Sequence, residues 1–321
     1  MTNLTSPHFT DADKAREYLE ALRWPQGPFC PHCGSFGAKR LPAQRGRPTK
    51  AHPEGALRAG VIQCNDCRKQ YSVTVGTVFE SSKIPLNKWL LANHLLNASK
   101  KGMSAHQLHR MLGITYKSAW FMFHRIREAM RPIGSPPMGG NGGTVEVDET
   151  FIGREPGVDA AKGGYKHKMK VLSLLDRDTG EKRSMVVNSV TIAEITPILR
   201  ANIDRETNLL TDDAGQYRFM ASHFASHRTT PHMKGVYVDP DDRTIHTNTI
   251  EGSFSIFKRG MRGVYQHCGK QHLHRYLAEF DFRYTHRAKM GVEDDQRAVI
   301  ALQGIAGKRL TYRRTDGLAA A

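Results

Sequence analysis

The sequence predicts a multidomain protein in which a small β-ribbon with two cysteine pairs and an all-α region precede an α/β domain. Three observations carry this prediction. Two Cys-x-x-Cys pairs lie near the N-terminus, apolar residues recur at helical spacing between residues 85 and 130, and alternating, strand-like segments begin at residue 144. The length of 321 residues also exceeds what one domain usually takes.

The charge balance indicates a polyanionic partner. The chain has 47 Lys and Arg residues against 31 Asp and Glu, a net charge of +16. An excess of this size favours nucleic acid, ahead of an anionic membrane surface. No apolar run approaches the roughly 20 residues of a membrane-spanning helix, and residues 1–7 do not resemble a secretory signal. We therefore expect an intracellular protein with no membrane partner.

The cysteine spacing predicts a zinc ribbon within residues 1–78, after a helix over residues 10–22. The two pairs are Cys30-Pro-His-Cys33 and Cys64-Asn-Asp-Cys67. Each supplies two thiolates from one tight turn, so the four can surround zinc tetrahedrally. Strand-like residues 61–63 and 70–75 flank the second pair. Four thiolates leave no open position, so the ion is expected to be structural; redox or unrelated thiols are the alternative.

The segment between the pairs, residues 34–60, is predicted to be a basic loop. It is rich in Pro and Gly and shows no periodicity. Within it, Arg45-Gly46-Arg47-Pro48 matches the core of an AT-hook, which lays Arg-Gly-Arg along a narrow, A/T-rich minor groove. The hypothesis is that Arg45 and Arg47 bind DNA. A solvated basic loop is the alternative.

Residues 79–135 are predicted to form a helical, DNA-binding region. A helix is expected over residues 85–97, and a shorter one from Ser104 to Gly113. Thr115 then caps a further helix. A short helix, a glycine-containing turn and a second helix are typical of a helix-turn-helix, which would place Tyr116, Lys117 and Ser118 in the major groove. An ordinary helical hairpin is the alternative. Prolines and glycines mark residues 136–143 as a linker.

Residues 144–290 are predicted to form an RNase H-like α/β domain. Strands are expected at residues 144–151, 168–175, 183–187, 208–211 and 235–238, and helices from residue 191, over 217–224 and from about residue 248. The order β-β-β-α-β-α-β-α is that of the RNase H-like fold, in which the first and fourth strands are neighbours. Residues 291–321 are expected to form a basic tail.

Three acidic residues occupy positions from which they can converge in this arrangement. Asp148 lies on the first strand, Asp212 just beyond the fourth and Glu251 on the last helix, with Lys258 two turns after it. Converging carboxylates bind hard divalent cations, and two such ions clamp the attacking and leaving oxygens of a phosphodiester. Each acid alone is more simply a surface or capping residue, and Asp213 competes with Asp212.

Together these stretches resemble a bacterial insertion-sequence DDE transposase of the zinc-ribbon group. The resemblance spans nearly the whole chain. It rests on both cysteine pairs, residues 82–89, Val147-Asp-Glu-Thr150, Thr211-Asp212, His246-Thr-Asn-Thr-Ile-Glu-Gly252 and Glu279-Phe-Asp-Phe-Arg-Tyr284. It implies that Asp148, Asp212 and Glu251 are the catalytic triad and that Lys258 is the lysine that this family keeps two turns after the acid. Asn248 is a lesser candidate for the third position.

The resemblance also implies partners, cofactors and a reaction. The enzyme would bind the terminal inverted repeats of an element through its ribbon and helix-turn-helix. With Mg²⁺ or Mn²⁺ at the triad it would cut double-stranded DNA and join the 3′-OH to target DNA. It would act in the cytoplasm at the nucleoid, as a homodimer or larger assembly, since both element ends are cut. A DNA-binding regulator without catalysis and a nuclease without joining activity are the alternatives.

Overall fold

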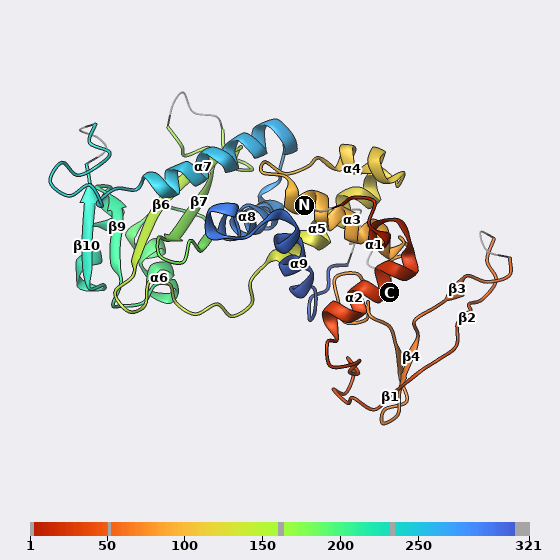
Figure 1. The fold of residues 1–321 in the computed structure, drawn as a ribbon. Helices are drawn as coiled ribbons and strands as arrows, with labels where there is room; N and C mark the ends of the chain where they lie inside the picture. The colour runs from red at the N-terminus through yellow and green to blue at the C-terminus, as the bar shows by residue number, and fades with distance from the viewer. Residues whose placement is uncertain (1–2, 51–52, 160–163, 232–234, 312–321) are drawn as a thin grey trace. The chain divides into compact units, whose positions relative to one another are not determined.

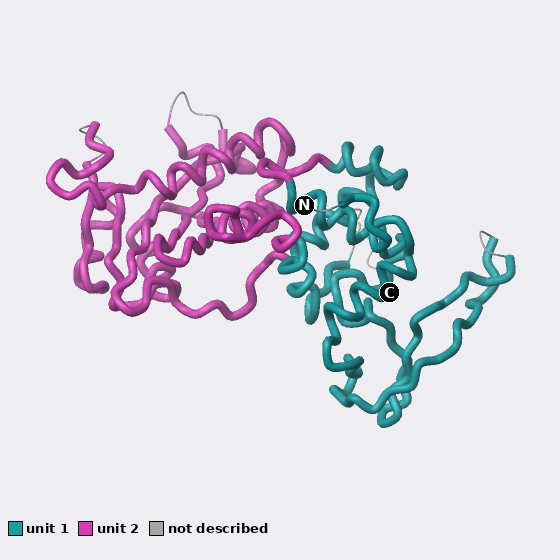
Figure 2. The backbone as a smooth tube through the Cα atoms, viewed as in Figure 1, with its two compact units in different colours: residues 1–98, 105–129, 298–321 teal, residues 99–104, 130–297 magenta. Residues whose placement is uncertain are grey.

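The structure, a computed structural model, describes residues 3–50, 53–159, 164–231 and 235–311. The chain divides into two compact units (Figure 2). Unit 1 comprises residues 1–98, 105–129 and 298–321, and unit 2 comprises residues 99–104 and 130–297. Within the described ranges, no helix combines the length and the apolar character needed to cross a membrane.

Unit 1 begins with the short helix α1 (Pro7–Thr10) and the helix α2 (Ala12–Arg23). The Asp11 carboxylate caps α2, since it accepts the N–H of Lys14 at 2.8 Å. The ribbon with the two cysteine pairs follows as a three-stranded antiparallel sheet in the order β1-β4-β5, of which Figure 1 labels β1 and β4. Its strands are β1 (Ala38–Arg40), β4 (Ile62–Cys64) and β5 (Gln70–Tyr71). The two strands predicted around the second cysteine pair are confirmed.

The basic segment 34–60 is not the plain loop that we predicted. Besides β1 it contains the strands β2 (Gln44–Arg45) and β3 (Leu57–Arg58), which pair antiparallel as a hairpin. Both strands are exposed along their whole length, so no apolar alternation marks them in the sequence. The two arms of the hairpin approach closely where the Gly46 N–H donates to the Ala56 carbonyl at 2.9 Å.

The helices predicted between residues 79 and 135 are present in the predicted order, and a further helix that was not predicted lies in the C-terminal part. They are α3 (Leu86–Ala98), α4 (Ala105–Leu112), α5 (Tyr116–Met130) and, from the C-terminal part, α9 (Asp294–Gln303). Between α4 and α5, Gly113 adopts a left-handed φ of +59°, and Thr115 Oγ1 accepts the N–H of Ser118 at 3.2 Å. The expected glycine turn and threonine cap are therefore both present.

The C-terminal segment differs from the expected tail. Residues Asp294–Gln303 form α9, and Ala298, Ala301, Leu302 and Ile305 are buried. The Asn93 side chain of α3 also donates a hydrogen bond to the Ala298 carbonyl at 2.9 Å. Burial of these four small or apolar residues thus makes the segment part of the folded protein, although its charges had suggested a solvated tail. Residues 312–321 of that expected tail lie outside the described residues.

Unit 2 is built on a five-stranded mixed sheet in the order β10-β9-β6-β7-β8. The strands are β6 (Thr144–Ile152), β7 (Met169–Asp176), β8 (Lys182–Val187), β9 (Asn208–Asp212) and β10 (Ser226–Thr230). The first three form an antiparallel meander, while β9 runs parallel to β6 and β10 parallel to β9. The first and fourth strands are neighbours, as predicted.

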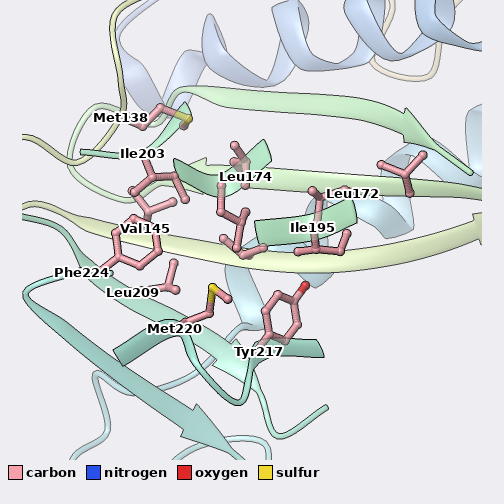
Figure 3. Packing of buried hydrophobic residues seen from close by; sticks show 13 residues of the cluster. Met138, Val145, Leu172, Leu174, Ile195, Ile203, Leu209, Tyr217, Met220 and Phe224 are labelled. Carbon is pink, nitrogen blue, oxygen red and sulfur yellow. The ribbon is translucent and has the colours of Figure 1, made fainter. Parts of the chain in front are cut away.

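Two hydrophobic clusters cover the two faces of this sheet. On one face, α6 (Ile192–Asn202) and the 3₁₀ turns η1 (Gly215–Tyr217) and η2 (Met220–Ser222) pack on β6, β7 and β9 (Figure 3). On the other face, α7 (Asn248–Gly260) and α8 (Lys270–Thr285) pack on the sheet. Successive residues of β6 therefore face different layers, with Val145 and Val147 toward α6 and Glu146 and Asp148 toward α7.

The fifth strand was predicted in the wrong place. Residues 235–238 contribute only an isolated bridge between Val238 and His246, whereas the fifth strand is β10. The sequence of β10, Ser-His-Arg-Thr-Thr, is polar because this strand lies at the sheet edge, so it carries little apolar signal. The helix predicted over residues 217–224 is replaced by the short turns η1 and η2.

Candidate active site and metal centre

The register of two neighbouring strands brings Asp148 and Asp212 together. Strand β6 pairs with β9 in parallel, with Val145 opposite Leu209 and Glu146 opposite Leu210. Continuing this register by two residues places Asp148 beside Asp212. Because side chains alternate along a strand, both carboxylates then lie on the sheet face that α7 covers. Two acids separated by more than sixty residues in sequence thus lie on the same face of two neighbouring strands inside the sheet.

The charges of the neighbouring carboxylates act on Asp148. The pKa of Asp148 is raised to about 8, chiefly by burial and then by the negative charge of Glu149. Asp212 and Glu251 raise it further, while the N–H of Glu149, which donates to the Asp148 carboxylate at 2.7 Å, acts in the opposite direction. The neighbouring Asp213 is exposed. This is a site of concentrated negative charge, which favours a proton or a cation.

Glu251 is supplied by the first turn of α7. The apolar stripe predicted for this helix is confirmed, since Ile250, Phe254, Phe257 and Met261 are all buried. Ile250 and Phe254 pack with Leu175 of β7, which holds the start of the helix on the sheet. The Thr247 hydroxyl donates to the Glu251 carboxylate at 3.3 Å. Asn248, the lesser candidate for the third position, is exposed at the first residue of α7.

A buried hydrogen-bond network ties the start of α7 to β6. Glu146 is fully buried, and its carboxylate accepts the N–H of Ile250 at 2.8 Å and Nε of Arg177 at 2.6 Å. Arg177 also donates to the carbonyl and to Nδ1 of His246, at 2.6 Å and 2.8 Å. Sequence reasoning treated Glu146 only as a neighbour of Asp148. The sequence signal that could have identified Glu146 is a charged residue within a strand whose two faces are both buried, because such a residue needs a buried partner.

Glu149 faces the opposite layer from Asp148. Its carboxylate accepts hydrogen bonds from the Tyr217 hydroxyl at 2.6 Å and from the Gln216 amide at 3.2 Å. Burial raises the pKa of Glu149 to about 7, while the hydrogen bond from Tyr217 opposes this rise and the charge of Asp212 adds to it. Tyr217 itself lies in the hydrophobic cluster of Figure 3. Glu149 is therefore fixed from the α6 side of the sheet.

Lys258 lies two turns after Glu251 on α7 and is half-buried. Its pKa is lowered, first by burial and then by the positive charge of Arg262. Asp148 acts in the opposite direction and Lys168 lowers the pKa further. The pKa of Lys258 therefore depends on the charge of Asp148 and on the charges of two other cations.

The four paired cysteines form a compact cluster in unit 1. Their Sγ atoms all lie within 4.8 Å of one another, with 3.6 Å between Cys30 and Cys67 and between Cys33 and Cys64. Tetrahedral zinc with Zn–S bonds of about 2.3 Å requires S–S separations of about 3.8 Å, so the cluster fits this ion.

The side chains predicted to bind DNA lie at the surface. Tyr116 is 44% exposed, and its ring stacks on His106 of α4 with 4.2 Å between the centroids. Lys117 is exposed and Ser118 is partly buried. In the β2–β3 hairpin, Arg45 and Arg47 are both exposed, and Arg45 forms an ion pair with Glu54 at 3.0 Å.

Comparisons with known proteins match both units. Residues 141–285 match the model of the ISXO2-like transposase domain, and residues 10–70 match that of the transposase zinc-ribbon domain. A protein of Halobacterium salinarum described as an uncharacterized protein in transposable element ISH50 is 28% identical over 306 residues. That alignment covers 89% of this chain and 95% of the relative.

A solved structure also matches part of the chain. It is the cryoEM structure of the simian T-cell lymphotropic virus intasome in complex with PP2A regulatory subunit B56 gamma. The matched chain is 14% identical, and the match covers 54% of this chain and 63% of that one, somewhat less than two thirds of its length. The TM-score of 0.28 is too low to support a conclusion about the fold.

Proposed function

We propose that this chain cuts and joins DNA at the ends of an insertion sequence. It combines a transposase zinc ribbon with an ISXO2-like transposase domain and so belongs to the zinc-ribbon group of insertion-sequence DDE transposases. The observation that supports the chemical part of this proposal is the pairing of β6 with β9, whose continued register sets Asp148 beside Asp212 on the sheet face that α7 covers, with Glu251 in the first turn of α7. Burial raises the pKa of Asp148 to about 8, and the negative charges of Glu149, Asp212 and Glu251 add to this rise.

The topology of unit 2 supports an RNase H-like catalytic domain. Three antiparallel strands are followed by a helix, and two further strands then extend the sheet in parallel beside the first strand. The order differs from the expected one in two places, because the fifth strand is β10 and the short turns η1 and η2 stand where a helix was expected. Asp148 lies at the middle of β6 and Asp212 at the end of the neighbouring strand β9.

The donor set fits a divalent cation of the magnesium type. Asp148, Asp212 and Glu251 offer oxygen ligands, which hard cations prefer, and their mutual repulsion is relieved by a positive ion. A bound Mg²⁺ or Mn²⁺ would supply the Lewis acidity that activates the attacking oxygen and stabilises the leaving one. The protein contributes rigidity, because β6, β9 and the anchored start of α7 fix the three carboxylates.

Lys258 positions the substrate. From its place on α7, two turns after Glu251 and within the influence of the Asp148 charge, the ammonium group binds a phosphate a few nucleotides from the bond that is cut and stabilises its charge. It takes no part in proton transfer. Water is the nucleophile in the cutting step, and the 3′-OH that cutting exposes is the nucleophile in the joining step.

Unit 1 supplies recognition of the terminal inverted repeats. A zinc ion held by Cys30, Cys33, Cys64 and Cys67 stabilises the ribbon. Helices α4 and α5 act as a helix-turn-helix, with Tyr116, Lys117 and Ser118 at the exposed start of the second helix. Arg45 and Arg47 add contacts with DNA from the basic hairpin. Because two element ends must be brought together, the active form on DNA is a homodimer or a larger assembly in the cytoplasm.

The test is incubation of the purified protein with its flanking terminal-repeat DNA, Mg²⁺ and a target plasmid. We expect nicked ends exposing a 3′-OH and joined products, and we expect Asp148→Asn to form neither. If Asp148→Asn cuts as well as the wild type, the site is misassigned. Cutting without joined products would favour a nuclease. Specific binding with no cutting by the wild type would favour a regulator.

A further inference from the structure

The charges of Arg262 and Lys168 act on Lys258 near the C-terminal end of α7. Lys258 and Arg262 are four residues apart, so they lie on the same side of α7 and of its π-helical extension η4 (Met261–Tyr265). Lys168 directly precedes β7. Lys168 and Lys258 are partly buried, and Arg262 is exposed. The group therefore forms a ridge that begins at the site and continues toward solvent.

Core packing holds these cations together. Met169, Phe257 and Met261 belong to one buried cluster, which also contains Ile152 at the end of β6. Each of the first three is the chain neighbour of one of the cations, Lys168, Lys258 and Arg262. The cluster thus fixes the backbone at three points around a common edge. The cations are brought together by the fold and do not depend on a flexible loop.

The cations repel one another, and the negative charge of Asp148 offsets this repulsion only in part. Arg262 and Lys168 both lower the pKa of Lys258, after the effect of burial. Within the described part of the chain, none of the three forms an ion pair with a carboxylate at 4.0 Å or less. Two neighbouring lysines behave differently, since Lys170 and Lys270 both pair with Glu155, at 3.7 Å and 2.5 Å. The protein thus neutralises the nearby lysines and leaves the ridge positive.

We propose that Lys168, Lys258 and Arg262 together form a phosphate-binding ridge for the DNA strand that enters the carboxylate site. This inference rests on the proposed function and adds Lys168 and Arg262 to it. A helix rises about 1.5 Å per residue, so Lys258 and Arg262 lie about 10 Å and 16 Å from Glu251 along α7. With one phosphate per 3.4 Å of rise, the contacted phosphates lie roughly three to five nucleotides from the cut.

The test is a phosphate scan with matched protein variants. Terminal-repeat duplexes each carry one uncharged methylphosphonate, at successive positions up to six nucleotides from the cut, and their affinity is measured by fluorescence anisotropy in Ca²⁺. For the wild type we expect a loss of about tenfold at one or two positions, roughly three to five nucleotides from the cut. The double variant Lys168→Gln/Arg262→Gln should bind the unmodified duplex about tenfold more weakly and show no further loss at those positions. For this double variant, the slope of log K against log salt concentration should be smaller in magnitude by about two.

The control is Arg259→Gln. Arg259 follows Lys258 directly, yet its guanidinium is bonded to Ser255 of its own helix, at 2.7 Å to the hydroxyl. This variant should bind and respond to the scan as the wild type does. Lys168→Arg/Arg262→Lys retains both charges and should restore binding, which separates loss of charge from misfolding.

An unchanged affinity, or an unchanged scan, for the Gln double variant would overturn the ridge. The proposed function is judged separately by cutting. If the wild type gives the expected scan but does not cut with Mg²⁺, the ridge stands and the catalytic assignment fails.

Discussion

The Glu146 carboxylate accepts the backbone N–H of Ile250 at 2.8 Å, which fixes the first turn of α7 to β6. Asp148 follows Glu146 by two residues on the same strand face, and Glu251 follows Ile250 directly. One hydrogen bond therefore sets the spacing between two of the proposed catalytic acids. We expect Glu146→Gln to lower the free energy of unfolding by about 2–4 kcal/mol, because Arg177 loses its buried counter-charge. Thermal unfolding measures this loss.

The same change is expected to slow DNA cutting by tenfold or more at a temperature at which the variant remains folded. Displacement of α7 moves Glu251 relative to Asp148, and small displacements of catalytic groups are costly. The matched control is Glu181→Gln, which removes a partly exposed pair with Arg183 and should cost less than about 1 kcal/mol. A destabilised Glu146→Gln protein that cuts at the wild-type rate would restrict Glu146 to a structural role.

The charge at the carboxylate site makes a prediction about stability and pH. The folded pKa of Asp148 is about 8, above the value of about 3.9 in an unfolded chain. The native state therefore binds more protons between these values, and the metal-free protein loses stability as the pH rises from about 4 to about 8. Asp148→Asn removes this loss. In buffer without Mg²⁺ or Mn²⁺, with the ribbon zinc retained, we expect it to raise Tm more at pH 8 than at pH 5, by about 2–4 °C for each kcal/mol recovered.

The control for this experiment is Asp213→Asn, since Asp213 is exposed beside Asp212. It should leave Tm nearly unchanged at both pH values. Equal gains for Asp148→Asn at pH 5 and pH 8 would show that the carboxyl group is not held protonated by its surroundings.

The cysteine cluster predicts the metal content of the chain. Wild-type protein should contain about one zinc ion per chain by elemental analysis, and Cys64→Ser should lose most of it, because Cys64 is a buried member of the cluster. Cys268→Ser is the matched control. Its thiol donates to the Gly269 carbonyl and lies outside the cluster, so zinc content should not change. Equal zinc loss in both variants would place the metal elsewhere.

The exposed start of α5 predicts sequence-specific binding. We expect Lys117→Ala to reduce the preference for terminal-repeat DNA over unrelated DNA by about 1–3 kcal/mol, as measured by competition binding. Lys14→Ala is the control, since Lys14 is an exposed lysine of the same unit that pairs with Glu17. An equal loss on both DNAs would indicate a phosphate contact. No loss would indicate an ordinary helical hairpin.

Strands with a buried face could be predicted from the sequence, and strands without one could not. β6 to β9 contain apolar residues that pack in the core, and their positions agree with prediction to within two residues. β10 is a polar edge strand, and β2 and β3 are exposed, so their pairing depends on backbone hydrogen bonds that leave no pattern in the side chains.

The residues of the candidate site also divide into those that could be predicted from the sequence and those that could not. Asp148, Asp212 and Glu251 could be named because each sits at a recognisable position in an element. The contacts of Glu146 with Arg177 and Ile250 could not, because they join residues 31 and 104 positions apart and depend on how α7 lies on the sheet. Likewise, the ridge of Lys168, Lys258 and Arg262 follows from core packing, which periodicity alone does not specify.

The β2–β3 hairpin and an AT-hook make opposite predictions for two glycines. In the hairpin, Gly55 has a left-handed φ of +80°, and a Cβ added there would lie 2.0 Å from the Gly46 carbonyl oxygen. A Cβ on Gly46 would meet the Ala56 carbonyl oxygen at 3.5 Å and Cδ of Arg58 at 3.8 Å, both ordinary contacts. The hairpin therefore tolerates Gly46→Ala but not Gly55→Ala. An extended Arg-Gly-Arg pressed into a minor groove requires glycine at position 46, where the backbone approaches the DNA most closely.

We expect the hairpin to be the form that binds. Gly55→Ala should then weaken binding to A/T-rich DNA at moderate salt nearly as much as Arg45→Ala/Arg47→Ala does, by about tenfold, whereas Gly46→Ala should bind like the wild type. Fluorescence anisotropy at two salt concentrations measures both effects. The reverse order of the two glycine variants would assign binding to an extended hook. Unchanged binding by the double arginine variant would exclude the hairpin from DNA contact, since the two exposed guanidinium groups are its proposed phosphate and groove contacts.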